Sequence, residues 1–356
     1  MEQAVDYYND LADIIQQGID NLRQRQQAQQ PRRPPHPPLT ITAEKLIAER
    51  KEDTVKLFTN FTIEQFEHIY SLVSEALAEG THKDAMVTPK TKLLLTLLWC
   101  RFNETYKPMA NRFGIKYTYM RGIVIQTIQR IHPVLEKIFI KWTSVSSRLG
   151  ANIVVNDFQF LLGSIDATVQ RVYRRSVNQK KYYSGKYKMH CMKTQAIVSP
   201  TGLLMHHSHC VPGAQHDMSL FKESGLKDLI EKENQECQAV IHQHCTVLAD
   251  SGYQGLSHEI TGGVTPHKKP RGGEFTEQQI HENDVIKHHR IKVENWFGRH
   301  KVLWAICAGT FRQSDRLYES VWGLCAALTN YHITLHPLRA DEHVPWDEQS
   351  SDDLEE

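Results

Sequence analysis

Residues 286–304, IKHHRIKVENWFGRHKVLW, constrain the fold more than any other stretch, because their apolar positions recur at the spacing of an α-helix. At about 100° per residue, Ile286, Val293, Phe297 and Trp304 fall within roughly 20° of one direction. Four large apolar side chains along one line need a surface to pack against. The pattern therefore predicts a helix with one buried stripe.

Three charged residues lie together on the flank of that stripe: Arg290, Glu294 and Lys301. They fall roughly 40–80° round the helix from the apolar line. A carboxylate between two cations, at the edge of a buried face, suits a helix that lines a charged cleft. The segments that complete the cleft have to come from elsewhere in the chain.

Two apolar runs in the second half of the chain end in aspartates. LLGSIDAT contains Asp166, and TVLADSGY contains Asp250. If both runs are strands, each aspartate stands at a strand end, where side chains of α/β folds emerge into a crevice. A helix carrying Glu294 across those ends would bring three carboxylates together. The alternative for each aspartate alone is a structural one, as the cap of a turn or helix.

Three converging carboxylates suit hard divalent cations, because Mg²⁺ and Mn²⁺ prefer oxygen ligands. Two such ions about 3.5–4 Å apart activate an attacking hydroxyl and stabilise the leaving oxygen of a phosphodiester. We therefore expect Asp166 and Asp250 to share the metals and Glu294 to complete the second site. The implied chemistry is phosphoryl transfer without a covalent protein intermediate.

The interval between Asp166 and Asp217 contains no acidic residue and is rich in lysine, arginine and tyrosine. Cations bind phosphates and aromatic rings offer stacking surfaces for unpaired bases; the alternative is a solvated, lysine-rich hairpin. A second basic run, TPHKKPRGGEF, comes just before the helix that carries Glu294. From these two runs and the helix flank we predict that DNA is bound by Arg171, Arg174, Arg175, Lys180, Lys181, Lys186, Lys188, Lys268, Lys269, Arg271, Arg290 and Lys301.

Residues 41–150 have a helical pattern that predicts a separate all-α domain. Thr62 and Thr88 are placed as N-caps of two of its helices. A short helix, a Gly114 turn and a longer helix then span about 107–131, the pattern of a DNA-binding helix-turn-helix. Lys116 and Arg121 would reach DNA from the start of the second helix. The alternative is an ordinary helical hairpin within a bundle.

The two ends of the chain differ in character from the body. Residues 3–24 predict an amphipathic helix, which pairs with another helix or packs on the body, and a Gln/Pro-rich linker follows up to about residue 40. The last sixteen residues hold eight of the 41 acidic residues and no Lys or Arg, so residues 1–340 carry 42 basic against 33 acidic side chains. This asymmetry indicates a polyanionic partner for the body, with the tail (339–356) as a solvated arm or a competitor.

Composition places the chain inside the cell. Hydrophobic residues make up 40% and charged residues 23%, as in globular proteins, and no apolar run approaches the ~20 residues of a membrane helix. The seven cysteines form no CxxC pair, which is typical of reduced thiols in cytosol or nucleus. The two His/Cys groups at 206–210 and 242–245 match no zinc-finger spacing. His216 and Asp217 are interpreted as a helix cap, with a supporting role near the metals as the alternative.

The motifs GSIDAT, KYYSGKYKMHCMKTQ, PGAQHD, LADSGYQG, PHKKPRGGE and RIKVENWFGRHK, in this order, resemble the catalytic domain of DDE superfamily endonucleases of the PIF/Harbinger type. These are eukaryotic transposases related to bacterial insertion-sequence enzymes. The resemblance implies a ribonuclease-H-like fold over 151–338, with Asp166, Asp250 and Glu294 as catalytic carboxylates. Arg290 and Lys301 match the bacterial signature around the last acid, whereas Lys287 stands where that signature has tyrosine. Ala167 replaces the usual glycine after the first aspartate.

The resemblance also implies a nuclear DNA transposase that cleaves and joins DNA using Mg²⁺ or Mn²⁺. Family members often work with a separate Myb-like DNA-binding protein, and a homo-oligomer is compatible with the sequence. The alternative is a domesticated, catalytically silent nuclear DNA-binding protein that keeps the fold. A metal-dependent hydrolase of small phosphoesters would fit the carboxylates but would leave the basic runs and the helix-turn-helix unexplained.

Overall fold

The computed structural model describes residues 39, 41–79 and 86–338. The amphipathic helix predicted at 3–24, the linker apart from residue 39, and the acidic tail lie outside the described residues. In the described ranges, no helix has both the length and the apolarity needed to cross a membrane.

The first part of the described chain is helical, as its sequence pattern predicts. Its helices are α2 (Ala43–Ala48), α3 (Glu52–Thr59), α4 (Ile63–Ala78), α5 (Pro89–Phe102), α6 (Tyr106–Phe113) and α7 (Tyr117–Phe139). The hydroxyl groups of Thr62 and Thr88 accept hydrogen bonds from the backbone at the starts of α4 and α5. Both predicted N-caps are therefore confirmed.

Helices α6 and α7 are joined through Gly114, which has a φ of 69°. A side chain would strain this left-handed turn, so glycine suits the position. One apolar face of α7 is buried in the helical core: Met120, Val124, Ile128 and Ile131. Lys116 and Arg121 are exposed at the start of α7. Their binding to DNA as part of a helix-turn-helix stays a prediction.

A mixed sheet follows, which agrees with the predicted α/β class. Its strands are β1 (Leu161–Arg171), β2 (Tyr183–Ser184), β3 (Met189–Val198), β4 (Leu204–His207), β5 (Val211–Pro212), β6 (Thr246–Ala249) and β7 (Gly263–Val264). The order is β2-β3-β1-β6-β7, and β4 and β5 also pair with β3. Strand β1 is antiparallel to β3 and parallel to β6, so it lies at the junction of an antiparallel and a parallel half.

The expectation that the first strand ends at Asp166 is wrong. Strand β1 continues to Arg171, because β3 pairs with it along this length and matches Arg171 with Cys191. The parallel neighbour β6 stops earlier, where Ile165 pairs with Ala249. Asp166 is therefore the first residue of β1 beyond the end of β6, and Asp250 is the first residue after β6. The edge of β1 beside Asp166 is therefore unpaired because β6 ends there, and not because β1 ends.

Two helices follow β5: α10 (Asp217–Glu223) and α11 (Leu226–Ile241), divided at Gly225, whose φ is 73°. After β6 come a 3-10 turn, η1 (Ser251–Tyr253), the short helix α12 (Leu256–Glu259) and strand β7.

The helix with the buried stripe is α13 (Glu277–Leu303), which begins earlier than the apolar pattern predicts. A capping box made by Thr276 and Gln279 fixes this start. All four stripe residues are buried, which confirms the predicted face: Ile286, Val293, Phe297 and Trp304. Two further helices, α14 (Ala305–Ala308) and α15 (Asp315–Leu335), close the described chain.

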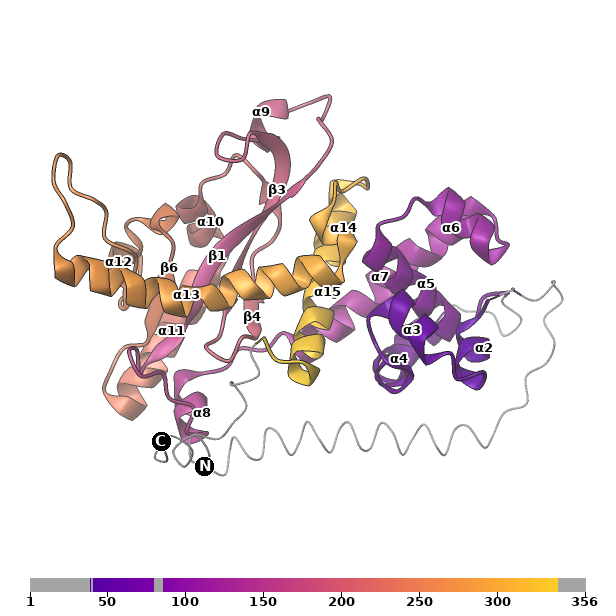
Figure 1. Cartoon of the computed structure of the whole chain (residues 1–356), viewed down its shortest axis with the longest axis horizontal. Helices are drawn as coiled ribbons and strands as arrows, with labels where there is room; N and C mark the ends of the chain where they lie inside the picture. Colours follow the sequence, from indigo (N-terminus) through magenta and orange to yellow (C-terminus); the bar gives the residue numbers. More distant parts are fainter. Residues whose placement is uncertain (1–38, 40, 80–85, 339–356) are drawn as a thin grey trace, which may run out of the picture.

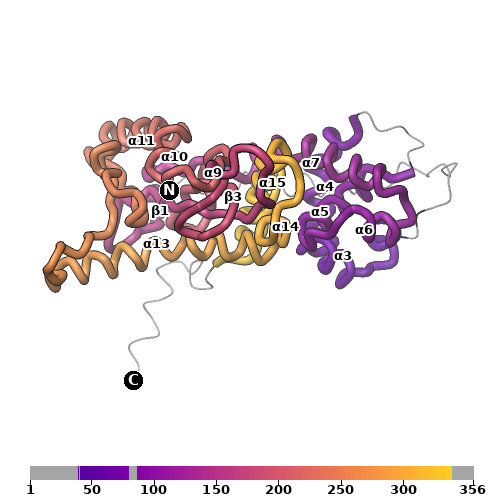
Figure 2. Tube along the Cα trace, turned by 90° about the horizontal axis from the view of Figure 1, so that it is seen from above, coloured from indigo at the N-terminus to yellow at the C-terminus, as the bar shows by residue number. Residues whose placement is uncertain are grey.

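The sheet lies between two helical layers. Helix α13 runs across β1 on one face, and α10 and α11 lie on the other side of the sheet (Figures 1 and 2). Helices α2–α7 gather at one end of the molecule, where α7 packs along α15. One hydrophobic core joins these helices to α13, α14 and α15, and a second core fills the space between the sheet and α10 and α11.

A histidine–glutamate cluster ties the helical part to the sheet. Glu136 of α7 contacts His132 Nε2 at 2.5 Å and His207 Nε2, from β4, at 3.0 Å. The hydrogen bond from His132, followed by that from His207, holds the pKa of Glu136 well below its usual range. This shared carboxylate, like α15, connects the two parts of the fold, so the predicted division near residue 150 stays a prediction.

Candidate functional site

Three carboxylates converge on one guanidinium group in the structure. Arg290 on α13 lies with Nη1 3.3 Å from Asp250 Oδ1 and Nη2 3.8 Å from both Asp166 Oδ2 and Glu294 Oε1. The three acids come from β1, from the residue after β6, and from α13, which are far apart in the sequence. The structure therefore brings together the three carboxylates that the sequence singles out, with Arg290 between them.

The alternation of side chains along β1 places Asp166 on the face that α13 covers. Ser164, on the same face, donates a hydrogen bond to the carbonyl of His289 on α13 at 3.4 Å. Gln170, also on this face, bonds the carbonyl oxygens of Ile306 and Gly309 beyond α13. These contacts fix α13 and the segment that follows it across β1.

Arg290 is the most enclosed member of the group. Its side chain is 9% exposed, against 25% for Asp166, 34% for Asp250 and 56% for Glu294. Its Nε is buried without a hydrogen-bond partner. The sequence predicts Arg290 as a contact for DNA phosphate, whereas the structure places its guanidinium among the carboxylates. A role in binding phosphate stays a prediction.

The group carries more negative charge than Arg290 neutralises. Burial raises the pKa of Asp166 to about 6, and the charges of Asp250 and Asp217 act in the same direction. The Ala167 amide, which donates to Asp166 Oδ1 at 2.7 Å, and Arg290 only partly offset this effect. Additional positive charge would therefore be favourable beside Asp166.

The donor set fits a hard divalent cation in chemistry, because it consists of carboxylate oxygens with unbalanced negative charge. As the side chains stand in the described part of the chain, no three acidic, histidine or cysteine residues are grouped closely enough to hold one metal ion. The guanidinium of Arg290 occupies space between the three acids, 3.3–3.8 Å from an oxygen of each. A cation shared by all three would have to take over part of that space.

Lys186 lies between β2 and β3, and its pKa responds to two acids near the site. Although burial opposes it, the charges of Tyr187 and Asp217 raise the pKa of Lys186, and Asp250 contributes to this rise. Lys186 is therefore within electrostatic reach of the carboxylate group. Tyr173, Tyr183 and Tyr187 are exposed there, by 61%, 43% and 40%.

The remaining predicted DNA contacts are distributed over this hairpin, a loop and the end of α13. Arg171, Lys180, Lys181 and Lys188 are exposed on or next to β1, β3 and α9 (Gln179–Tyr182). Arg174 bonds Gln179 at 2.7 Å, and Arg175 forms an ion pair with Asp315 of α15.

Lys268, Lys269 and Arg271 are exposed in the loop before α13, and Lys269 pairs with Glu274 at 2.8 Å. Lys301 is partly buried, and this burial lowers its pKa. Lys287, at the departure from the bacterial signature, is exposed on α13. The structure brings Arg290 to the carboxylates but leaves these other residues spread over the surface, and their roles in DNA binding stay predictions.

Asp217 belongs to the neighbourhood of the site, since its charge acts on the pKa of Asp166. His216 occupies the N-cap position of α10, as the sequence predicts, but its side chain makes no cap hydrogen bond there. Asp217 Oδ1 instead accepts a hydrogen bond from Lys193 Nζ at 2.7 Å. Lys193 is buried in the middle of β3, an unusual position for a lysine. A lysine inside an apolar strand segment was therefore the sequence signal that an acidic partner such as Asp217 lies nearby.

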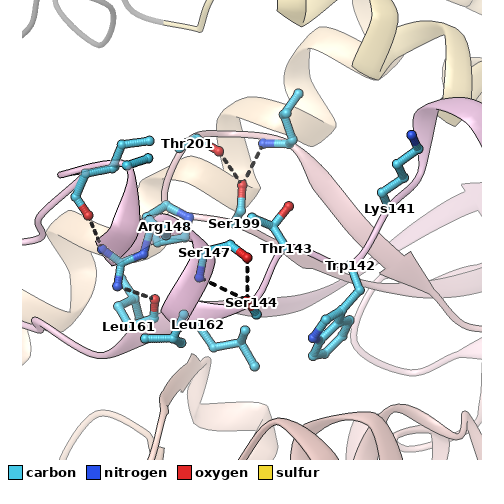
Figure 3. Close-up of a pocket in the computed structure, with 15 residues that line it drawn as sticks. Lys141, Trp142, Thr143, Ser144, Ser147, Arg148, Leu161, Leu162, Ser199 and Thr201 are labelled. Carbon is cyan, nitrogen blue, oxygen red and sulfur yellow. Dashed lines mark hydrogen bonds between the residues drawn. The ribbon is translucent and has the colours of Figure 1, made fainter. Parts of the chain in front are cut away.

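A pocket elsewhere in the fold is separate from the carboxylates. It is lined by residues of α8 (Val145–Gly150), the start of β1 and the β3–β4 turn, including Ser144, Ser199 and Thr201 (Figure 3). Arg148 in this region donates to the carbonyl oxygens of Gln159 at 2.7 Å and Leu161 at 3.2 Å. These bonds hold the start of β1, so we assign this region a structural role.

Comparison with known proteins gives two matches. Residues 165–330 match the family model described as DDE superfamily endonuclease. The chain is also 27% identical, over 245 residues, to a protein described as a probable transposase for insertion sequence element IS702 from Microchaete diplosiphon. That alignment covers 68% of this chain and 80% of the relative. The family match begins at Ile165 and includes all three carboxylates that surround Arg290.

Proposed function

Over residues 165–330 this chain belongs to the DDE superfamily of endonucleases, and from this premise we propose that it is a DNA transposase that cleaves and joins DNA phosphodiesters. The observation that carries the proposal is the convergence of Asp166, Asp250 and Glu294 on Arg290. Three carboxylates, from β1, from the residue after β6 and from α13, form the type of oxygen-rich site that divalent cations occupy in phosphoryl-transfer enzymes.

In this proposal, Asp166, Asp250 and Glu294 would hold Mg²⁺ or Mn²⁺, which would lower the pKa of an attacking water or hydroxyl and stabilise the leaving oxygen. Asp166 on β1 and Asp250 directly after the neighbouring strand β6 set the position of the site. Glu294, the most exposed of the three, completes the site from α13. Lys186 and the exposed tyrosines around it hold the DNA backbone and bases next to the carboxylates.

Several finer assignments belong to the same proposal. The order of the sheet, with its antiparallel and parallel halves, supports a ribonuclease-H-like nuclease domain at 151–338. The exposed Lys116 and Arg121 support a helix-turn-helix in an all-α domain at 41–150. We also propose the PIF/Harbinger type, a nuclear location, a Myb-like partner protein and a homo-oligomer, which rest on the sequence resemblance alone.

Cleavage of DNA tests the function directly. The full chain is incubated, in Mg²⁺ or Mn²⁺, with DNA carrying the terminal inverted repeats that flank its own coding region. We expect nicking by the natural protein and a loss of about 1000-fold or more for Glu294→Gln, since metal catalysis supplies several kcal/mol at about 1.4 kcal/mol per tenfold. The matched control, Glu277→Gln at the exposed start of α13, should cleave normally.

Two outcomes would contradict this proposal. Unchanged cleavage by Glu294→Gln would remove Glu294 from the mechanism. DNA binding without nicking in either metal, by the natural protein, would support the catalytically silent DNA-binding protein instead.

The basic hairpin makes a separate prediction about DNA affinity. Lys180 and Lys181 stand together on α9, and replacing both by glutamine should reduce the number of phosphate contacts by two. The slope of log K against log salt concentration should then become shallower by about 1.8, at roughly 0.9 per contact. Fluorescence anisotropy between low and moderate salt measures this slope. Replacing Lys222 and Lys232 on α10 and α11 provides the control, and an equal change in both double variants would contradict the assignment.

A further inference from the structure

Asp217 belongs to α10, which lies on the side of the sheet opposite to α13. It is the first residue of α10, which packs against η1, the turn that directly follows Asp250. A methyl group placed on Gly252, in this turn, would lie 2.8 Å from Asp217 Oδ2. The absence of a side chain at Gly252 therefore lets the carboxylate of Asp217 come close to the backbone next to Asp250.

The two oxygens of Asp217 have different surroundings. Oδ1 is fixed by Lys193, which also donates a hydrogen bond to the carbonyl of Gln215 at 2.5 Å. The side chains of Lys193 and Asp217 are 9% and 20% exposed, so this ion pair is largely shielded from solvent. Oδ2 faces η1 instead. One oxygen thus anchors the carboxylate while the second points toward the turn that carries Asp250.

A second, independent feature indicates that a ligand belongs here. Tyr253, the last residue of η1, is fully buried, and its hydroxyl group has no hydrogen-bond partner. Burial raises its pKa well above the usual range, and the charges of Asp217, Asp166 and Asp250 add to this rise. Tyr253 stands three residues after Asp250, in the turn against which α10, the helix that begins at Asp217, packs. A buried, unpaired hydroxyl group is costly unless a water molecule or an ion completes its surroundings.

We propose that Asp217 is a fourth carboxylate of the divalent-metal site, contacting the cation or its bound water through Oδ2. This inference rests on the proposed function and adds a residue to the same site. Lys193 acts as the positioning residue, because it holds Oδ1 and leaves Oδ2 free to turn toward the cation. Gly252 provides the room for that approach. The unpaired hydroxyl of Tyr253 would then meet water that belongs to the metal.

Binding of Mn²⁺ to the full chain tests this proposal without any measurement of cleavage. Isothermal titration calorimetry or Mn²⁺ electron paramagnetic resonance gives the affinity. We expect Asp217→Asn to weaken binding by about 10- to 100-fold, as removal of groups around a metal typically does. The asparagine keeps the shape of the side chain and can still accept from Lys193. Asp228→Asn, which removes an exposed carboxylate from α11, should change the affinity by less than about twofold.

A second variant tests the same contact without removing the charged partner of the buried Lys193. Gly252→Ala leaves every charge in place but pushes Asp217 Oδ2 away, and should also weaken Mn²⁺ binding. If Asp217→Asn or Gly252→Ala binds Mn²⁺ like Asp228→Asn while Asp166→Asn loses binding, the fourth carboxylate is refuted and the metal site stands. If Asp166→Asn also binds normally, the proposed metal site itself is refuted.

Discussion

Asp166→Asn is expected to make the metal-free protein more stable while it removes metal-dependent cleavage. The pKa of the Asp166 carboxyl is raised from 3.8 to about 6, with burial as the largest cause. Ionisation of this group therefore opposes folding near neutral pH, by roughly 3 kcal/mol at about 1.4 kcal/mol per pH unit. The neutral asparagine avoids this cost, and the melting temperature should rise by several degrees in EDTA.

The direction of the pH dependence follows from the raised pKa. Below pH 4 the carboxyl is protonated in both the folded and the unfolded states, and the two proteins should be about equally stable. As pH rises toward 6, the natural protein should lose stability relative to Asp166→Asn, and the difference should be constant above pH 7. Thermal unfolding in EDTA at several pH values measures this difference. Asp228→Asn is the control, since its carboxylate is exposed.

Addition of Mn²⁺ should make the natural protein more stable than Asp166→Asn, the opposite of the order in EDTA. A cation that binds the folded state stabilises it in proportion to the logarithm of its concentration over Kd. The natural protein should therefore gain stability with Mn²⁺, whereas Asp166→Asn should gain little. If the stability of Asp166→Asn depended on pH in the same way as that of the natural protein, Asp166 would not carry the unfavourable charge.

Arg290→Met is the second change with a large expected effect, and it should destabilise the metal-free protein by about 3 kcal/mol. Removing one partner from a buried ionic group leaves the other charges without compensation. Methionine keeps an apolar, unbranched side chain at this buried position, so the packing of α13 changes little. Thermal or urea unfolding in EDTA measures the loss, and Arg316→Met, at an exposed position of α15, is the control.

Saturating Mn²⁺ should restore most of the stability that Arg290→Met loses, because a divalent cation supplies the charge that the guanidinium supplied. The cost of Arg290→Met should also be smaller in the Asp166→Asn background, since the two residues interact. An equal loss with and without Mn²⁺ would mean that the metal does not bind between the carboxylates that Arg290 neutralises.

Local chemistry predicted several elements correctly. The apolar spacing in α13 identifies its buried face, because a helix repeats every 3.6 residues regardless of its surroundings. Thr62, Thr88 and Gly114 identify helix starts and a turn, because caps and left-handed glycines depend on adjacent residues. Asp166, Asp250 and Glu294 were recognisable as candidates because each stands next to an apolar run or stripe.

Long-range pairing explains the local errors. Strand β1 runs past Asp166 because β3, more than twenty residues away in sequence, continues to pair with it. No pattern within residues 161–171 contains this information. Strand β6 ends at Ala249, opposite Ile165 of β1. Asp166 and Asp250 are the residues that follow this last pair, which brings them side by side.

By itself, the sequence determined the chemistry of the protein: which carboxylates are available, which segments are basic, and which helix face is buried. Only the tertiary structure decided how these groups share charge. It placed Arg290 between three carboxylates, and it brought Asp217 to the same region through Lys193. The physical reason is that electrostatic partners are selected by distance in space, and those distances are set by strand pairing and by the packing of α13, α10 and η1.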